Sequence, residues 1–294
     1  MGPDEYTPIA HNNAFTNRLV AFNLDVAARW GGEGGATLEE RKLFAETAAA
    51  LPLCRSPDGK LVLQCEEFDS FAEPRFDELW KERSVPLGAQ VPQERLYRMK
   101  CIKQADVILL MMLFPHEFSD EEVRAAWEYY LPLTTHDSSL STCVHAVVAL
   151  RLGERGLARR FWEKSLAVDL DAKGGAAGEG IHIAGCGGIW QVAVLGFAGM
   201  RTAVQSEVFS LDPKLPDEWT RLAFPVVWKG RRLYIEIDGE TCLVTHRGGK
   251  DLDVEVSGRR ERLPAGGRIC FPCAAMNSDR KSGSCLGREE GDEA

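Results

Sequence analysis

The stretch LSTCVHAVVALRLGERGLARRFWEKSLAVDL, residues 140–170, contains two amphipathic helical patterns joined by a short break that holds glycine. Five apolar side chains in its first half recur at spacings of three and four residues, which places them on one face of a helix. They are Leu140, Cys143, Val144, Val147 and Val148. Gly153 and Gly156 are expected to end this helix, and Leu157, Phe161 and Leu166 mark the apolar face of the next. Two helices with so short a connection are expected to pack antiparallel.

The first two-thirds of the chain repeats this alternation of helix, short loop, helix and long loop. A helix near the N-terminus is expected because four apolar residues share one face: Phe15, Leu19, Phe22 and Val26. Capping boxes at Thr37–Glu40 and Ser119–Glu122 mark two more helix starts. Buried helices are expected over residues 103–114 and 190–200, whereas residues 51–80, rich in aromatics and proline, indicate a long loop. This alternation is typical of a helical bundle or of an α/α toroid, whose long loops build the site at one end.

From about residue 207 the apolar residues alternate with polar ones at period two, which is typical of strands. The alternating residues include Leu233, Ile235, Ile237, Leu252, Val254 and Val256. Lys229-Gly230, Asp238-Gly239 and Gly248-Gly249 are turn signals between these strands. We therefore expect helices over residues 1–206 and a small antiparallel β domain over 207–275. Residues 276–294 are polar and charged and are expected to form a disordered tail.

Composition narrows the class of protein. The chain has 294 residues and a net charge of −9, and such a negative surface disfavours general binding to nucleic acid. No apolar run is long enough to cross a bilayer, and the N-terminus lacks the basic and apolar regions of a signal peptide. The nine cysteines are scattered, apart from Cys270 and Cys273, and a lone pair is weak support for zinc. Reduced thiols in a cytoplasmic protein without a metal are the expectation.

Two polar stretches at helix starts contain candidate catalytic and binding residues. GPDEY, Gly2 to Tyr6, holds a carboxylate beside an aromatic ring, where a raised pKa would suit a general acid. The alternative is a solvated turn in which Asp4 or Glu5 stabilises a helix N-terminus. Lys103 and Gln104 precede an apolar run and are able to hydrogen-bond sugar hydroxyls. The alternative there is a lysine that extends from a helix end to solvent.

Two further stretches carry hydroxyl groups and glycines. TTHDSSLS, Thr134 to Ser141, gathers five hydroxyl groups and one imidazole before the helix of residues 140–152, the make-up of an anion site at a helix N-terminus. A single serine N-cap is the alternative, although one cap needs only one hydroxyl. GEGIHIAGCGGIW, Gly178 to Trp190, has Glu179 and His182 as its only titratable residues. Its small residues allow close approach of a ligand or of a second helix.

Taken in this order, the stretches resemble the blocks of glycoside hydrolase family 65. The resemblance rests on GPDEY followed by NNAFTN, on KQADV, on TTHDSSLS, on GIHIAGCGGIWQ with GFAG, and on LDPKLPDEW before the β domain. It extends from Gly2 to about Ile237. It implies a mainly α fold, the second half of an (α/α)6 toroid, followed by a small antiparallel β-sheet domain. Because the first half and a β-sandwich normally precede these blocks, we expect the chain to be the C-terminal portion of a longer protein.

The resemblance also implies an inverting disaccharide phosphorylase acting on an α-linked glucose disaccharide. Glu5 maps onto the general acid, and Lys103 and Gln104 are assigned to the glucose hydroxyls. His136, Ser138 and Ser139 are assigned to inorganic phosphate, the co-substrate; no other cofactor is implied.

Phosphate is already anionic and needs no base, whereas water as the nucleophile needs a second carboxylate. A hydrolase of the same family, an α-glucosidase or trehalase, is therefore the alternative, with Glu179 or Asp137 as its base. A third interpretation is a truncated, non-catalytic remnant. No nucleic-acid or membrane partner is expected, and a homodimer is compatible with the family.

Overall fold

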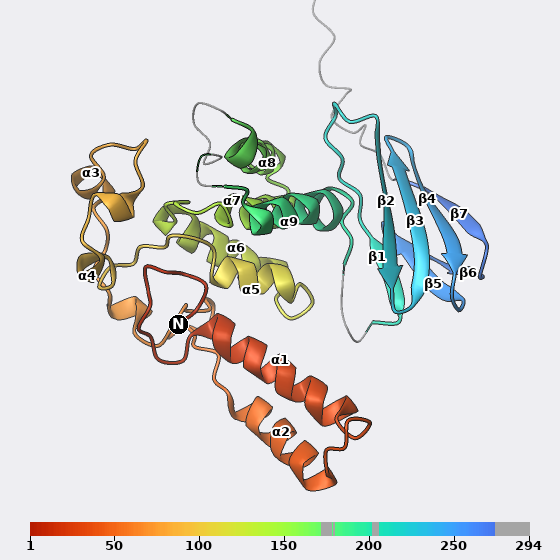
Figure 1. Ribbon diagram of the computed structural model, residues 1–294, viewed down its shortest axis with the longest axis horizontal. Coiled ribbons are helices and arrows are strands. Elements are labelled where there is room, and N and C mark those ends of the chain that lie inside the picture. The colour runs from red at the N-terminus through yellow and green to blue at the C-terminus, as the bar shows by residue number, and fades with distance from the viewer. Residues whose placement is uncertain (172–177, 179, 202–205, 274–294) are drawn as a thin grey trace, which may run out of the picture. The chain divides into compact units, whose positions relative to one another are not determined.

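The computed structural model describes residues 1–171, 178, 180–201 and 206–273. It divides into two compact units, Met1–Gly196 and Phe197–Ala294. The first is helical and the second is made of strands (Figure 1), so the expected class, a mainly α fold followed by a small β domain rich in antiparallel strands, is confirmed. The division falls earlier in the chain than the expected boundary at residue 207. Glu179 and the expected tail over 276–294 lie outside the described residues.

Helix pairs make up most of the first unit. The longer helices are α1 (Ala14–Trp30), α2 (Leu38–Ala50), α5 (Val107–Leu113), α6 (Asp120–Tyr130), α7 (Ser141–Arg151), α8 (Arg155–Leu170) and α9 (Ile183–Gln191), the last followed by a π-helical segment, Val192–Phe197. The long connection between α2 and α5 contains the short helices α3 (Phe76–Leu79) and α4 (Gln93–Leu96). Helices α1 and α2 pack on each other, as do α7 and α8, as the short connections predict.

Local sequence explains where these helices begin and end. Both predicted capping boxes form, Thr37 with Glu40 at α2 and Ser119 with Glu122 at α6. Helix α7 ends before Gly153, whose φ of 81° lies in the left-handed region that glycine tolerates. Gly156, in contrast, lies inside α8, so its expected role as a helix end is wrong.

The start of α5 differs from expectation, and this difference decides where Lys103 and Gln104 lie. The apolar helix predicted over residues 103–114 begins only at Val107, because the backbone before it pairs with another segment. Ile102 N donates to Leu133 O at 3.0 Å, and Thr135 N donates to Ile102 O at 2.8 Å. This parallel bridge leaves Lys103 and Gln104 outside the helix and beside the segment that leads to His136.

The core of the first unit lies around α5 and α7. Helix α5 buries most of its side chains, Val107, Ile108, Leu110, Met111 and Met112. Helix α7 buries all of its residues except Val147 and Arg151. None of the helices in the described part of the chain has both the length and the apolar character needed to cross a bilayer.

The second unit contains two sheets. In sequence order the strands are β1 (Val208–Leu211), β2 (Arg221–Trp228), β3 (Arg231–Asp238), β4 (Thr241–Gly248), β5 (Leu252–Val256), β6 (Arg259–Leu263) and β7 (Arg268–Pro272). One sheet has the order β2-β3-β4-β7 and is antiparallel throughout; the other has the order β1-β5-β6. The three predicted turns connect β2 to β3, β3 to β4 and β4 to β5. The parallel pairing of β1 with β5 was not predicted, since alternation does not reveal strand direction.

Candidate active site

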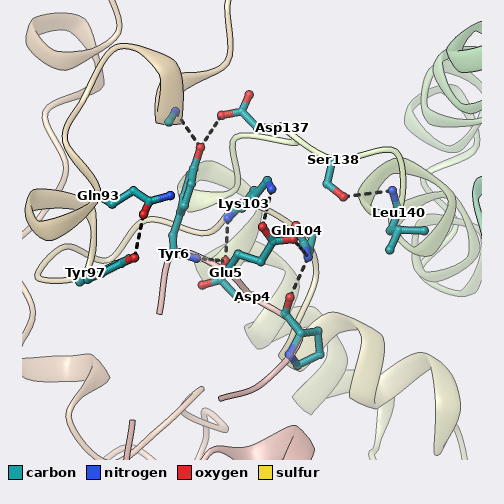
Figure 2. Close-up of polar contacts among 12 residues, drawn as sticks. Asp4, Glu5, Tyr6, Gln93, Tyr97, Lys103, Gln104, Asp137, Ser138 and Leu140 are labelled. Carbon is teal, nitrogen blue, oxygen red and sulfur yellow. Dashed lines mark hydrogen bonds and ion pairs between the residues drawn. The ribbon is translucent and has the colours of Figure 1, made fainter. Parts of the chain in front are cut away.

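The carboxylate of Glu5 is held by the two side chains that the sequence predicts as sugar ligands (Figure 2). Lys103 Nζ donates to Oε2 of Glu5 at 2.6 Å, and Gln104 Nε2 donates to Oε1 at 3.2 Å. Gln104 Nε2 also donates to the carbonyl of Pro3 at 2.7 Å. The Glu5 side chain is 55% exposed and that of Lys103 is 25% exposed. Three predicted site residues therefore lie together, with the carboxylate open to an incoming ligand.

The electrostatics of Glu5 differ from expectation. The bond from Lys103 lowers the pKa of Glu5, partial burial opposes this, and the Gln104 bond adds to the lowering. The expected raised pKa is therefore wrong for this arrangement. The physical reason is the Lys103 ammonium, whose hydrogen bond to Oε2 outweighs the partial burial of the Glu5 carboxyl group. The hydrogen bond from Lys103 therefore favours the ionised form of Glu5.

Asp4, immediately before Glu5, is fully buried and connects three segments. Its Oδ1 accepts from the backbone N–H of Tyr6 at 3.2 Å and of Lys103 at 2.8 Å. Its Oδ2 accepts from Gln64 Nε2 at 3.0 Å. Burial raises the pKa of Asp4, and the bonds from Gln64, Lys103 and Tyr6 oppose that rise. Asp4 thus ties the loop of the predicted acid directly to the backbone of the predicted sugar ligand.

A second buried carboxylate, Asp106, lies below this loop. Its Oδ2 accepts from Asn13 Nδ2 at 3.1 Å, and the same nitrogen donates to Gln64 O at 3.1 Å. Burial, and then the negative charge of Asp4, raise the pKa of Asp106 to about 7. A Cβ atom at Gly2 would lie 2.4 Å from Asp106 Oδ2, which explains the glycine at the start of the GPDEY stretch.

Tyr6 and Asp137 join the GPDEY stretch to the TTHDSSLS stretch (Figure 2). Tyr6 Oη donates to Asp137 Oδ2 at 2.9 Å and accepts from Gly88 N at 2.8 Å. Leu87 N donates to the same Asp137 oxygen at 2.8 Å. One oxygen of Asp137 therefore anchors two loops, a use that competes with the alternative role of Asp137 as a base.

The serines of the TTHDSSLS stretch lie at the start of α7. Ser138 Oγ accepts from Leu140 N at 3.3 Å, and Ser138 O accepts from Ser141 N at 3.2 Å. The N-cap residue of α7 is Leu140, and no side chain caps the helix, so the serine N-cap considered from sequence does not form. Ser138 and Ser139 are half-buried. Asp137 of this stretch reaches the loop of Glu5 through Tyr6.

His136 is placed differently from a cationic phosphate ligand. Its backbone φ is 58°, and its ring packs on His145 of α7 and Phe161 of α8 with centroid separations of 4.6 and 5.0 Å. Burial, and then His145, lower the pKa of His136 to about 2, so the ring is neutral. Its Nδ1 lies 2.8 Å from Ser141 Oγ. If that hydroxyl donates, Nε2 carries the ring proton and is able to donate in turn.

The glycine-rich stretch, Gly178 to Trp190, comes close to the TTHDSSLS stretch at Ser139. A Cβ atom at Gly185 would lie 3.7 Å from Ser139 O and 3.8 Å from Ser139 Cβ, so α9 approaches this turn closely. His182 precedes α9, and its Nδ1 lies 2.8 Å from Asp169 Oδ1. Its backbone N–H donates to Asp169 Oδ2 at 2.9 Å. Asp169 therefore fixes the imidazole of His182 from helix α8.

Sequence reasoning missed the buried supports of this site. The sequence presents Asp4 as one of two carboxylates in a polar turn, and no local pattern marks Asp4, Gln64 or Asp169 as a buried support. Tyr6 and Asp137 belong to the GPDEY and TTHDSSLS stretches, which the sequence does single out. Their mutual hydrogen bond could not be predicted, because it joins segments that are distant in the chain. In the described part of the chain no group of three His, Cys, Asp or Glu side chains is arranged to hold a metal ion.

Comparison with known proteins follows the same division of the chain. Residues 1–191 match the glycosyl hydrolase family 65 central catalytic domain, and residues 200–263 match the C-terminal domain of that family. The chain is 33% identical over 282 residues to a kojibiose phosphorylase of Caldanaerobacter subterraneus, covering 90% of this chain and 36% of that protein. It is 31% identical over 281 residues to an α,α-trehalose phosphorylase of Geobacillus stearothermophilus, covering 89% and 36%.

A solved structure described as a putative kojibiose phosphorylase from the human microbiome superposes with a TM-score of 0.77 at 24% identity. It covers 92% of this chain and 37% of that one, and it supports the fold. The chain spans about a third of the length of the curated relatives named above, 36% in both cases. Because a family model matches more than half of the residues, the chain belongs to glycosyl hydrolase family 65.

Proposed function

We propose that this chain supplies the acid and the phosphate-binding turn of an inverting α-glucoside phosphorylase. A phosphate oxygen attacks the anomeric carbon of the glucose unit from the face opposite the leaving sugar. The glycosidic C–O bond breaks, its electron pair goes to the leaving oxygen, and that oxygen takes the proton of Glu5. The products are β-glucose 1-phosphate and the released sugar.

The observation that carries this proposal is the Glu5–Lys103–Gln104 cluster beside the segment that leads to Ser138 and Ser139, just before α7. Lys103 and Gln104 present three and two N–H donors that suit the oxygens of a sugar ring. The bridge between Ile102 and Thr134 holds these donors next to the segment of Ser138 and Ser139. An acid, sugar donors and hydroxyl groups in one region are what a phosphorolytic displacement requires.

Phosphate is favoured over water because the site near Glu5 is richer in donors than in free carboxylates. Asp137 already accepts from Tyr6 and Leu87 through one oxygen. Ser138, Ser139 and the uncapped N-terminus of α7 offer hydroxyl and N–H groups to an anion. His136 adds a neutral N–H donor in the tautomer in which Ser141 donates to its Nδ1. The kojibiose and trehalose phosphorylases among the relatives support the same choice.

The decisive experiment uses the purified protein with a panel of α-linked glucose disaccharides. Turnover is measured with and without inorganic phosphate. Proton NMR, recorded immediately after the reaction starts, identifies the anomeric configuration of the product. β-Glucose 1-phosphate formed only with phosphate supports the proposal. Glucose released at the same rate without phosphate overturns it in favour of the hydrolase.

The role of Glu5 is separated from folding by the leaving group. Glu5→Gln is expected to lower disaccharide phosphorolysis by about 10²–10⁴-fold. It should spare phosphorolysis of α-glucosyl fluoride, because fluoride leaves without a proton donor. Glu121→Gln, an exposed carboxylate on α6, is the matched control. Equal loss on both substrates would show that Glu5 is not the acid.

A further inference from the structure

The two donors that hold Glu5 are the same groups that the proposed function gives to the sugar. Lys103 Nζ and Gln104 Nε2 each spend a hydrogen bond on one oxygen of the carboxylate, at 2.6 and 3.2 Å. In this state the carboxylate is stabilised without a proton, yet a general acid must carry one when the glycosidic bond breaks. The site as it stands therefore holds its acid in the wrong protonation state for catalysis.

We propose that binding of the glucose unit loads the acid: its hydroxyls take the Lys103 and Gln104 donors, and the freed Glu5 carboxylate takes up a proton from solvent. This inference rests on the proposed function and adds how the sugar prepares its own proton donor. The balance is simple. One carboxylate and one proton from water or buffer give one carboxyl group, which later gives that proton to the leaving oxygen.

The groups around Glu5 make this exchange feasible. The Glu5 side chain is half-exposed, and ion pairs in such positions are weak, so hydroxyl oxygens compete for the ammonium. Lys103 and Gln104, from the segment before α5, are the groups whose bonds and charge act on the Glu5 carboxyl within the described structure. The adjacent Asp4 carboxylate is turned inward to Gln64 and to backbone N–H groups.

The direction of the effect follows from the same contacts. The Lys103 bond lowers the pKa of Glu5, so the loss of that bond raises the pKa back toward its usual value. A sugar that covers the carboxylate also removes water from it, which shifts protonation further in the same direction. Protonation on binding is thus the expected sign, and further deprotonation would contradict it.

Carbon-13 NMR of the 294-residue chain labelled at glutamate carboxyl carbons tests the exchange directly. The Glu5 signal is assigned with Glu5→Gln and titrated without and with saturating D-glucose. We expect glucose to move the Glu5 titration to higher pH in the wild-type chain. Lys103→Met should produce a similar upward shift without glucose, and glucose should then add little. A Glu5 signal that glucose leaves unmoved, or moves downward, overturns the proposal.

Lys100→Met is the matched control. Lys100 lies three positions earlier and pairs with Glu73 at 2.8 Å and Asp69 at 3.4 Å, so its loss removes the same charge without touching Glu5. The Glu5 titration should stay unchanged in this variant, and an equal shift would assign the effect to net charge. Failure of the proposed function reads differently. Phosphate-independent hydrolysis with an intact glucose-driven shift removes the phosphorylase but keeps the acid-loading step.

Discussion

Tyr6 Oη donates to Asp137 Oδ2 at 2.9 Å, although the two residues are 131 positions apart in the chain. The bond connects the loop of the predicted acid to the turn that precedes α7. Leu87 N and Gly88 N complete the junction by donating to Asp137 and Tyr6. The loop of Tyr6, the loop of Leu87 and Gly88, and the turn of Asp137 are thereby held together around two oxygens, Tyr6 Oη and Asp137 Oδ2.

Tyr6→Phe is expected to lower the free energy of unfolding by about 1–2 kcal/mol, because it removes one hydrogen bond and leaves Gly88 N without its acceptor. Urea denaturation followed by tryptophan fluorescence measures the change. Tyr97→Phe serves as a control, since the exposed Tyr97 hydroxyl bonds only the neighbouring Gln93 side chain among the contacts described. Equal effects of the two substitutions would argue against a special role for the junction.

Asp137→Asn distinguishes a structural role of Asp137, as an acceptor that holds two loops, from a role as the catalytic base of a hydrolase. Asparagine keeps an oxygen for Leu87 N, so we expect turnover to fall far less than in Glu5→Gln, for which about 10²–10⁴-fold is expected. Initial rates on the preferred disaccharide with saturating phosphate give the comparison. A loss as large as that of Glu5→Gln would mark Asp137 as a catalytic base after all.

Asp4→Ala should destabilise the first unit by about 3 kcal/mol or more, because it leaves Gln64 and two backbone N–H groups without their buried acceptor. Asp4→Asn keeps one acceptor oxygen and should cost less. Asp77→Ala, at a fully exposed carboxylate, is the control. Chemical denaturation measures all three. If Asp4→Ala unfolds at the same urea concentration as the wild type, the hydrogen bonds of Asp4 do not stabilise the first unit.

Asp106→Asn should stabilise the protein at high pH. The folded pKa of Asp106, about 7, lies above its usual value of 3.8, so its stabilising contribution is present below the usual value and is lost as pH rises toward 7. Over that interval the linkage amounts to at most about 4 kcal/mol. The gain of Asp106→Asn over the wild type should therefore increase from pH 4 to pH 8 in urea denaturation. A constant difference across this range would contradict the buried, partly protonated Asp106.

His145 should give the opposite pH dependence. Burial lowers its pKa from 6.5 to about 4, although its bond to Ser141 O partly opposes this. The unfolded chain therefore binds the proton first, and the stability from neutral His145 is lost as pH falls from 6.5 toward 4, by about 3 kcal/mol in total. His145→Phe should flatten this acid-side slope in pH-dependent denaturation. An unchanged slope would show that other groups dominate acid unfolding.

The helix pairs and the strands could be predicted because their signals are local. The spacing of Cys143, Val144 and Val147 defines α7 without reference to the rest of the chain, and both capping boxes act within four residues. The start of α5 could not be predicted in this way. Its first expected turn is replaced by the bridge between Ile102 and Thr134, a pairing between segments that no periodicity records.

The site was predicted at the level of its stretches more than of its side chains. Glu5, Lys103 and Gln104 do lie together, as the motifs imply. The lowered pKa of Glu5 was not predicted, because it depends on the Lys103 ammonium, which comes from a segment about a hundred positions away. His136 was expected among the anion ligands by residue type, but the left-handed backbone at that position turns its ring onto His145 and Phe161.

The bridge between Ile102 and Thr134 has a practical meaning for redesign. Backbone groups of Ile102, Leu133 and Thr135 form two of the hydrogen bonds that join these segments, and exchanging side chains leaves those two bonds in place. The Thr135 hydroxyl adds a third bond, to Ile102 O at 3.3 Å. Variants at neighbouring positions therefore keep the backbone groups that set the spacing between the segment of Lys103 and Gln104 and the segment that leads to His136. Proline at position 102 or 135 is the exception, since it would delete one of the two N–H groups on which that spacing depends.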